Sequence, residues 1–263
     1  NHTSWNLITT KDGLNFNNLG TSLPHGSDQE KDKNAYTGSV VQAKNGLYYL
    51  FYTGHNQTEA FCENNIPLQV ILRAVSKDGV SWEKDSDFSL YGKDPYQKFD
   101  WRDPFVFYHE KEKQYWMLVT AALKGQTERR AGCIALLKSK DLEEWTYFDP
   151  LFAPKKYITM ECSDLFKMGD WYYLVYSTFN ERFVTHYRKS KSINGPYCST
   201  PFDTFDARGF YAAKTASDGE KRYAFGWVPS KLGRNDFGPW EWGGTLVVHE
   251  IYQDDNGDLL TRM

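Results

Sequence analysis

Short runs of bulky apolar residues alternate with turn residues along the whole chain. The clearest runs are rich in aromatic side chains and lie at Asn45–Tyr52, Lys113–Val119, Gly169–Tyr176 and, more weakly, Gly219–Trp227. Aromatic and β-branched residues in runs of strand length, bounded by turn residues, predict β-strands. No long segment repeats its apolar residues at the helical period of 3.6 residues. The pattern therefore predicts an all-β protein.

A second pattern, small-Lys-Asp-x-x-x-aromatic, recurs three times. The copies are Thr10–Phe16, Ser76–Trp82 and Ser139–Trp145, and each follows a short apolar run. Asp hydrogen-bonds to its own backbone and Gly accepts a positive φ, so that Lys-Asp-Gly predicts a tight turn between two strands. The turn unit and the aromatic unit alternate, which gives roughly four strands in each period of about 60 residues.

Repeats of four antiparallel strands are typical of propeller blades. We therefore expect a five-bladed β-propeller, in preference to a β-sandwich whose hairpins are similar by coincidence. At about 60 residues per blade, 263 residues provide a little over four blades, and the chain opens on the second unit of a pair. We expect a single propeller domain over residues 1–263 whose first blade is incomplete and lacks its opening strand or strands.

Composition narrows the class of function. The chain has 31 basic and 34 acidic residues with the two signs interspersed, which argues against a nucleic-acid partner. No stretch approaches the roughly 18 apolar residues of a membrane span, and the His residues show no HxH or HExxH spacing. We expect no membrane partner, no metal and no cofactor. The near-neutral charge suits either a cytoplasmic or an exported bacterial enzyme.

The most informative stretch lies at the start of a predicted strand. Trp101-Arg102-Asp103-Pro104 leads into an apolar run, and Pro is tolerated at the first position of a strand because no ladder N–H is needed there. An adjacent Arg and Asp on a strand point to opposite faces unless a bend re-aims one of them. Taken alone, an Arg–Asp turn on the surface is the simpler interpretation.

A second stretch of this kind contains Glu161. It lies within the run Ile158–Cys162, where we expect partial burial, and burial raises the pKa of a carboxyl group as a general acid requires. The simpler alternative is a carboxylate at a strand edge. Asp103 and Glu161 are 58 residues apart, which suggests equivalent positions in successive blades. Inner strands of a propeller converge on its axis, and two carboxylates in one aromatic-rimmed pocket suit glycoside hydrolysis.

Several motifs together resemble those of glycoside hydrolase family 32, the invertases, levanases and inulinases. They occur in the family's order and cover nearly the whole chain. The matches are Tyr36-Thr37-Gly38-Ser39 to Phe-Ser-Gly-Ser, Tyr49–His55 to the strand that follows it, Trp101–Pro104 to Arg-Asp-Pro, Glu161–Phe166 to the Glu-Cys motif, Phe210–Thr215 to Asp-Phe-Tyr-Ala, and Gly226-Trp227 to Gly-Trp.

This resemblance implies a five-bladed propeller and retaining, double-displacement hydrolysis of β-fructofuranosides of the sucrose or fructan type. By position, Glu161 matches the general acid/base, which protonates the leaving oxygen and then activates water. Asp103 matches the transition-state stabiliser that holds fructose hydroxyls. The substrate-binding candidates are Arg102, which would orient the pair, and the pocket residues Tyr36, Thr37, Trp101, Asp206, Tyr211 and Trp227. For Trp101, a role in the core is an equal alternative. The expected partner is a small carbohydrate.

The chain departs from the family pattern in several places. The family's nucleophile is an Asp near the N-terminus, and no Asn-Asp-Pro-Asn motif occurs here. We expect the nucleophile upstream of Asn1, so that these 263 residues alone would be inactive. Tyr36-Thr37 replaces Phe-Ser, and Val248-His249 stands where the family has Pro-Arg, which indicates a divergent subgroup. We also expect no C-terminal β-sandwich in this chain.

Two other functions remain open at this stage. The arabinanase and xylosidase group of five-bladed enzymes inverts configuration, with carboxylates about 6.5–9.5 Å apart against about 5–5.5 Å in retaining enzymes. A carbohydrate-binding propeller without catalysis is the third hypothesis, and the missing nucleophile motif keeps it open for this chain.

Overall fold

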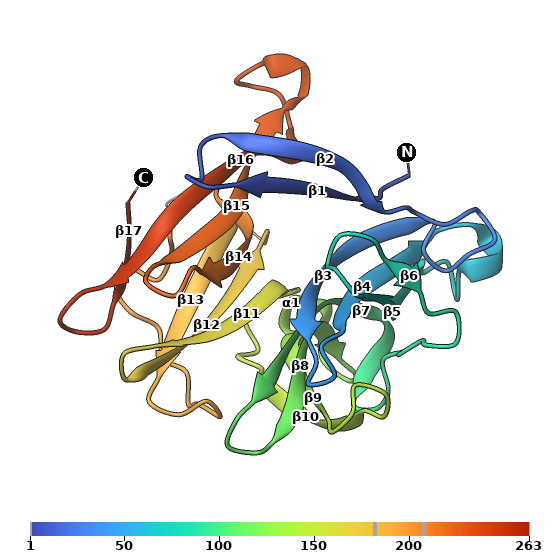
Figure 1. Cartoon of the computed structure of the whole chain (residues 1–263), viewed down its shortest axis with the longest axis horizontal. Helices are drawn as coiled ribbons and strands as arrows, with labels where there is room; N and C mark the ends of the chain where they lie inside the picture. The colour runs from blue at the N-terminus through green and yellow to red at the C-terminus, as the bar shows by residue number, and fades with distance from the viewer. Residues whose placement is uncertain (1, 181–182, 207–208, 263) are drawn as a thin grey trace. The chain divides into compact units, whose positions relative to one another are not determined.

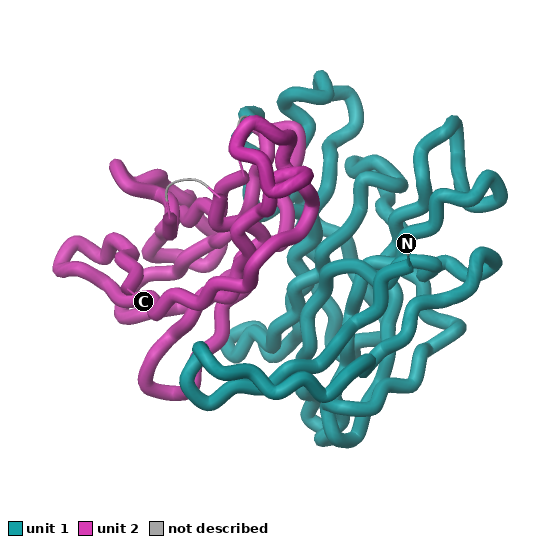
Figure 2. Tube along the Cα trace, turned by 90° about the horizontal axis from the view of Figure 1, so that it is seen from above, with its two compact units in different colours: residues 1–156 teal, residues 157–263 magenta. Residues whose placement is uncertain are grey.

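The structure is a computed structural model that describes residues 2–180, 183–206 and 209–262. Within these ranges the regular elements are strands, apart from the short helix α1 (Glu128–Ala131) and the 3-10 turns η1 (Glu59–Phe61) and η2 (Leu232–Arg234). The all-β class predicted from the apolar runs is confirmed. The chain forms two compact units, residues 1–156 and residues 157–263 (Figure 2).

The first unit holds two four-stranded antiparallel sheets and a two-stranded ribbon (Figure 1). In both sheets, neighbouring strands are consecutive in the chain. The ribbon is β1 (Trp5–Thr10) and β2 (Phe16–Leu23); the first sheet is β3 (Asn34–Gln42), β4 (Tyr48–Asn56), β5 (Leu68–Ser76) and β6 (Glu83–Lys84); the second is β7 (Tyr96–His109), β8 (Gln114–Leu123), β9 (Gly132–Ser139) and β10 (Thr146–Phe152).

The second unit holds two further antiparallel sheets with the same sequential order. The three-stranded sheet is extended at the edge of β13 by two isolated bridges, His186–Thr204 and Lys189–Cys198. The strands are β11 (Glu161–Met168), β12 (Trp171–Thr178) and β13 (Val184–Ser190) in one sheet, and β14 (Tyr211–Ser217), β15 (Arg222–Lys231), β16 (Trp240–Gln253) and β17 (Leu259–Arg262) in the other.

Sheets of up to four sequential antiparallel strands are propeller blades, and the all-β propeller fold is confirmed. The expected number of blades was wrong, because the described residues form four blades and not five. The difference lies in the β1–β2 ribbon, which the repeat arithmetic counted as part of a blade. Its two strands pair with each other and, in the part of the chain described, form a sheet of their own.

The repeated Lys-Asp turns are built from local hydrogen bonds. Oδ1 of Asp78 and Oδ1 of Asp141 each accept two backbone N–H groups, from the second and third residues that follow, at 2.8 to 3.0 Å. These bonds stabilise the charged carboxylates and hold the pKa of Asp78 and of Asp141 below the usual range. The turns join β1 to β2, β5 to β6 and β9 to β10, which confirms the predicted strand–turn–strand units.

Aromatic side chains form the cores between neighbouring blades of each unit. In the first unit, Phe51 of β4 meets Trp145 edge to face at 5.6 Å between ring centroids, in a cluster that also contains side chains of β7 and β8. In the second unit, Tyr173 and Tyr187 belong to a cluster that includes Phe210 next to β14. The aromatic content of the sequence is therefore used largely to pack one sheet on the next.

Candidate active site

The first strand of each of the four described blades carries a β-bulge, near the start of β3, β11 and β14 and in the middle of β7. Pro104 therefore lies within the bulge of β7, and its predicted place at the first position of a strand was wrong. The register shifts by one residue between Arg102 and Phe105 in β7, between Glu161 and Asp164 in β11, and at corresponding places in β3 and β14. In β7, β11 and β14, the first residue of the bulge, directly after the paired residue that precedes it, has a positive φ of 53° to 56°. Bulges of this kind re-aim side chains and are frequent next to active sites. The bend that the Arg–Asp pair needed is therefore present.

Asp103 and Glu161 do not occupy equivalent positions in their blades, although their spacing along the chain suggested this. The residues with positive φ are Asp103 in β7, Cys162 in β11 and Ala212 in β14. Asp103 thus corresponds to Cys162, and Glu161 corresponds to Arg102. The expectation was wrong by one residue, because spacing along the chain carries no information about which residue takes the left-handed position.

Asp103 is buried in the first unit, where two hydroxyl groups hold it. Its side chain is only 6% exposed. Its backbone N–H donates to Oγ1 of Thr53 on β4 at 2.8 Å, and Oγ1 of Thr120 on β8 donates to its Oδ2 at 3.1 Å. Both threonines are fully buried. The position of this carboxylate is therefore set by side chains from two different blades.

Arg102 contacts more acidic and polar groups than the motif alone suggested. Its guanidinium forms an ion pair with Asp100, and Nη1 donates to Oε1 of Gln69 at 3.1 Å. Nε lies 4.0 Å from Oδ2 of Asp103. Sequence reasoning missed Asp100 and Gln69. The position of Asp100 was a usable signal, because residues two apart on a strand point to the same face.

Tyr36 and Thr37 lie at the start of β3, in the same unit as Asp103. The half-exposed ring of Tyr36 stacks on His55 with 5.0 Å between centroids and 24° between planes. Burial raises the pKa of Tyr36, and the pKa of His55 is lowered first by burial and then by the charge of Arg102. His55 is therefore expected to be neutral near pH 7, and the Tyr36–His55 pair offers a largely apolar face.

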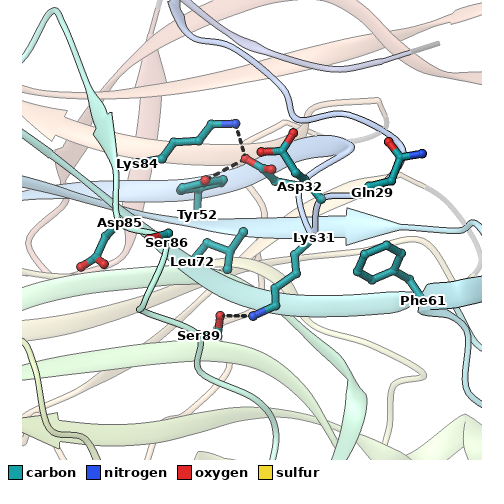
Figure 3. Close-up of a pocket in the computed structure, with 11 residues that line it drawn as sticks. Gln29, Lys31, Asp32, Tyr52, Phe61, Leu72, Lys84, Asp85, Ser86 and Ser89 are labelled. Carbon is teal, nitrogen blue, oxygen red and sulfur yellow. Dashed lines mark hydrogen bonds and ion pairs between the residues drawn. The ribbon is translucent and has the colours of Figure 1, made fainter.

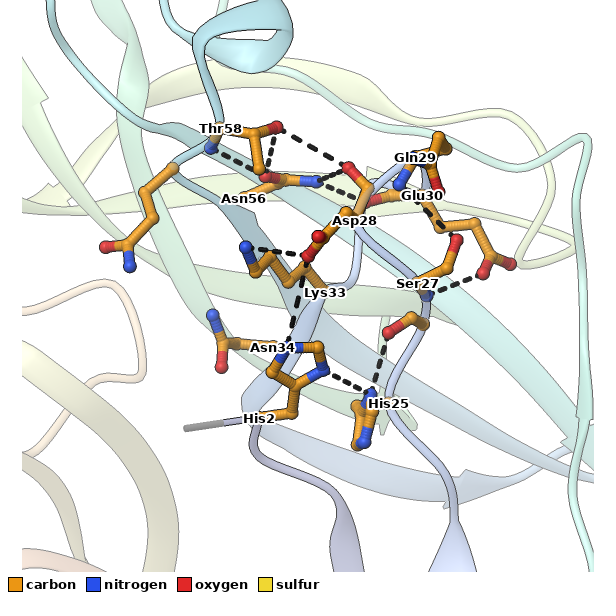
Figure 4. A network of polar contacts seen from close by, with 12 residues as sticks. His2, His25, Ser27, Asp28, Gln29, Glu30, Lys33, Asn34, Asn56 and Thr58 are labelled. Carbon is orange, nitrogen blue, oxygen red and sulfur yellow. Dashed lines mark hydrogen bonds and ion pairs between the residues drawn. The ribbon is translucent and has the colours of Figure 1, made fainter.

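A polar network fixes the segment that leads into β3 (Figure 4). The buried side chain of Asn56 donates to the backbone oxygens of Asp28 and Glu30 at 3.0 and 2.7 Å. Lys33 forms an ion pair with Asp28 at 2.7 Å. These contacts tie residues 28–33 to the end of β4, and so they help to position Tyr36 a few residues later.

Glu161 lies at the start of β11 in the second unit and is partly buried, as predicted. Its Oε2 accepts a hydrogen bond from the hydroxyl of Tyr211, which is the first residue of β14 in the neighbouring blade. Tyr211 is almost fully buried. Two residues that the sequence placed in one site are therefore in direct contact. When Glu161 is ionised, their hydrogen bond is charge-assisted.

Aromatic rings surround Tyr211. Its ring centroid lies 5.2 Å from that of Trp227, 5.0 Å from Phe183 and 5.9 Å from Trp242. Trp242 is 65% exposed although it packs against three other rings of this group. Sequence reasoning named Trp227 and missed Phe183 and Trp242. Trp242 belongs to the Trp-rich stretch 240–244, whose composition was the available signal.

Two further candidates have other surroundings. Trp101 is fully buried: it stacks on Tyr147 at 5.8 Å and donates from Nε1 to the backbone oxygen of Leu90 at 3.1 Å. The core role left open by the sequence is the one observed, and a sugar-facing ring at this position is not. Asp206 lies before β14 with its side chain 48% exposed, and Oδ2 is 3.6 Å from Nε2 of His249.

A pocket of about 280 Å³ in the first unit lies among Lys31, Asp32, Tyr52 and Lys84 (Figure 3). Lys84 forms an ion pair with Asp32 at 2.6 Å, and the Tyr52 hydroxyl donates to the same carboxylate at 2.9 Å. None of the residues that line this pocket is a predicted site residue. Both lysines of this pocket are already engaged, Lys84 by Asp32 and Lys31 by Oγ of Ser89 at 2.7 Å.

Metal-binding clusters and membrane-spanning helices are both absent from the residues that the structure describes. These residues contain no group of three or more His, Cys, Asp or Glu side chains that could hold a metal ion. Nor does any helix in those ranges have the length and apolar character of a membrane span.

Comparison with known proteins places these observations in a family. The chain is similar to sucrose-6-phosphate hydrolase of Escherichia coli, with 28% identity over 98% of this chain and 55% of that protein. The chain thus spans about half the length of this relative. Among solved structures, it is similar to sucrose-6-phosphate hydrolase from Lactobacillus gasseri, with a TM-score of 0.77, 22% identity and coverage of 98% and 54% of the two chains. A Bombyx mori β-fructofuranosidase in complex with sucrose has a TM-score of 0.75 and 20% identity, with coverage of 98% and 55%.

These structural similarities show the same fold at low sequence identity. The family assignment comes from the sequence model of the glycosyl hydrolases family 32 N-terminal domain, which matches residues 1–261. This match covers nearly the whole chain and includes every residue of the candidate site. The chain therefore belongs to glycosyl hydrolase family 32.

Proposed function

We propose that this chain carries the acid/base and the stabilising carboxylate of a retaining glycosidase that hydrolyses β-fructofuranosides. Glu161 is the proposed acid/base and Asp103 the proposed stabiliser. The observation that carries the proposal is the contact between Tyr211 and Glu161, because it joins two residues that the family motifs independently assign to one site. The two compact units are proposed to act together as one catalytic domain.

In the first step, Glu161 gives its proton to the glycosidic oxygen while a nucleophilic carboxylate attacks the anomeric carbon. The bond to the leaving alcohol breaks, and a covalent fructosyl-enzyme forms. In the second step, Glu161 takes a proton from water, the water oxygen attacks the same carbon, and the nucleophile leaves as a carboxylate. The proposed nucleophile is the Asp that the family carries near its N-terminus, for which these 263 residues contain no matching Asn-Asp-Pro-Asn motif. Tyr211 fixes the orientation of Glu161 through Oε2.

Asp103 is proposed to accept hydrogen bonds from fructose hydroxyls as positive charge develops on the ring. A carboxylate held in place before the reaction stabilises this charge without reorganisation in the transition state. The burial of Asp103 and its bonds to two threonines support this role. The ring faces of Tyr36 and Trp242 are proposed to contact the apolar faces of the sugars.

The relatives suggest which substrates to test first. The Escherichia coli and Lactobacillus gasseri proteins are named sucrose-6-phosphate hydrolases, and the Bombyx mori structure contains sucrose. We propose that the protein expressed from the complete gene releases fructose from sucrose or from its 6-phosphate. Levan and inulin test the fructan alternative.

The decisive experiment compares wild type with Glu161→Gln and Asp103→Asn, each expressed from the complete gene. Both substitutions keep the shape of the side chain, and we expect each to lower kcat by at least about 10³-fold with an unchanged melting temperature. Near-wild-type turnover by Glu161→Gln would refute the assignment. Proton NMR of the first product separates retention from inversion, and inversion would favour the arabinanase-like mechanism. Sugar binding by a wild-type protein without turnover would indicate a binding propeller.

A further inference from the structure

A single buried hydroxyl group connects two strands of the candidate site in the first unit. Oγ1 of Thr53 accepts the backbone N–H of Asp103 at 2.8 Å and donates to the backbone oxygen of Thr37 at 2.9 Å. Thr53 is fully buried, so that water does not compete for either bond. One hydroxyl proton and one lone pair therefore link β3 and β7, the two strands that carry Thr37 and Asp103.

The backbone at Asp103 needs this support. Its φ of 56° is uncommon for a residue other than Gly, and such conformations persist where the surroundings determine them. Thr120 holds the carboxylate through Oδ2, whereas Thr53 holds the backbone N–H. Each threonine thus constrains a different part of the same residue, and loss of the Thr53 bond frees the backbone to rotate the carboxylate.

The same arrangement recurs in the second unit. Oγ of Ser177 on β12 accepts the backbone N–H of Ala212, which has a φ of 54°, at 3.0 Å. Ser177 lies opposite Glu161 in the register of its blade, as Thr53 lies opposite Tyr36 in the first. A hydroxyl on the second strand of one blade therefore holds the left-handed residue of the next blade in both units. Of these two held residues, Asp103 carries a carboxylate and Ala212 does not.

From this geometry we propose that Thr53 is a positioning residue for Asp103, and that its hydroxyl sets the catalytic rate without contacting the substrate. The inference rests on the proposed function, because it assumes that Asp103 acts on the sugar. A change of about 1 Å in the position of a catalytic group can lower the rate by about 100-fold. The effect is expected in kcat, since Asp103 acts mainly in the transition state.

The test uses Thr53→Val and Thr53→Ser in the protein expressed from the complete gene, with sucrose as substrate. Thr53→Val keeps the shape and removes the hydroxyl, and we expect kcat to fall by about 10- to 100-fold with KM within about threefold. Thr53→Ser keeps the hydroxyl, and we expect kcat within about threefold of wild type. The matched control is Ser39→Ala: Oγ of Ser39 accepts the backbone N–H of Val106, the same kind of bond to β7 three residues beyond Asp103.

Ser39→Ala should keep the wild-type kcat although it removes an equivalent bond. All assays are run at least about 15 °C below the lowest melting temperature, so that the folded fraction is constant. If Thr53→Val melts too low for this, Thr53→Ala is measured by the same criterion. A wild-type kcat in the hydroxyl-free variant, or an equal loss in Ser39→Ala, would overturn the inference. Asp103→Asn separates the two proposals. If this variant retains turnover, the proposed role of Asp103 is wrong. If Asp103→Asn is inactive while Thr53→Val keeps the wild-type kcat, only the proposed role of Thr53 is wrong.

Discussion

Replacing Tyr211 by Phe should move the alkaline side of the pH profile to higher pH. The substitution removes the hydroxyl that donates to Oε2 of Glu161 and keeps the buried ring. A donor to a carboxylate stabilises its ionised form, so that its loss makes the carboxyl group hold its proton more tightly. Glu161 must be protonated in the first step. Activity should therefore persist to a higher pH in the variant.

The magnitude follows from the chemistry of the bond. A hydrogen bond to a charged group contributes about 1.5–3 kcal/mol. One pH unit corresponds to about 1.36 kcal/mol of differential interaction. The alkaline midpoint of kcat/KM should therefore rise by about one to two pH units.

The assay is kcat/KM for sucrose between about pH 4 and pH 9, because this ratio reports the ionisation of the free enzyme. Tyr223→Phe is the matched control: Tyr223 lies on β15 of the same blade, and its hydroxyl donates to the carboxylate of Asp218, not to that of Glu161. Its profile should coincide with that of wild type. An unchanged alkaline midpoint in Tyr211→Phe, or a shift to lower pH, would refute the reasoning.

Three further predictions concern packing, the sugar contact and acid stability. Trp101→Ala should lower the free energy of unfolding by about 3–5 kcal/mol in urea titrations, because the ring is fully buried; a loss below about 1 kcal/mol would contradict the core role. Trp242→Ala should raise KM for sucrose by about two- to tenfold, as expected for a ring contact of about 0.5–1.5 kcal/mol, with kcat nearly unchanged; an unaltered KM would exclude the contact. The lowered pKa values of Asp78 and Asp141 stabilise the fold above about pH 4, and this contribution is lost as the pH falls through the folded-state values. Between pH 5 and pH 3, the double variant D78N/D141N should therefore lose less stability than wild type in melting experiments, and an equal loss would count against the turn bonds.

Much of the candidate site was predicted as a set of residues, whereas its contacts were not. Arg102, Asp103 and Glu161 were named because each lies in a motif that the sequence placed at the start of a predicted strand. The partners of these residues come from other strands: Gln69 from β5, Thr120 from β8 and Tyr211 from β14. Tyr211 was named from its own motif, although its contact with Glu161 was not, and no motif marks Gln69 or Thr120. The number of blades was also mispredicted, because a turn motif identifies a pair of strands but not the sheet that they join.

The sequence by itself determined the strands and the turns of this protein. The bonds of Asp78 and Asp141 reach only two or three residues along the chain, so that local sequence is sufficient to specify them. Only the tertiary structure decided which residue in each bulge adopts the left-handed conformation. Asp103 and Thr53 are 50 residues apart, as are Tyr211 and Glu161. Contacts at such separations form only when neighbouring sheets pack together, because that packing decides which hydroxyl meets which backbone or carboxylate.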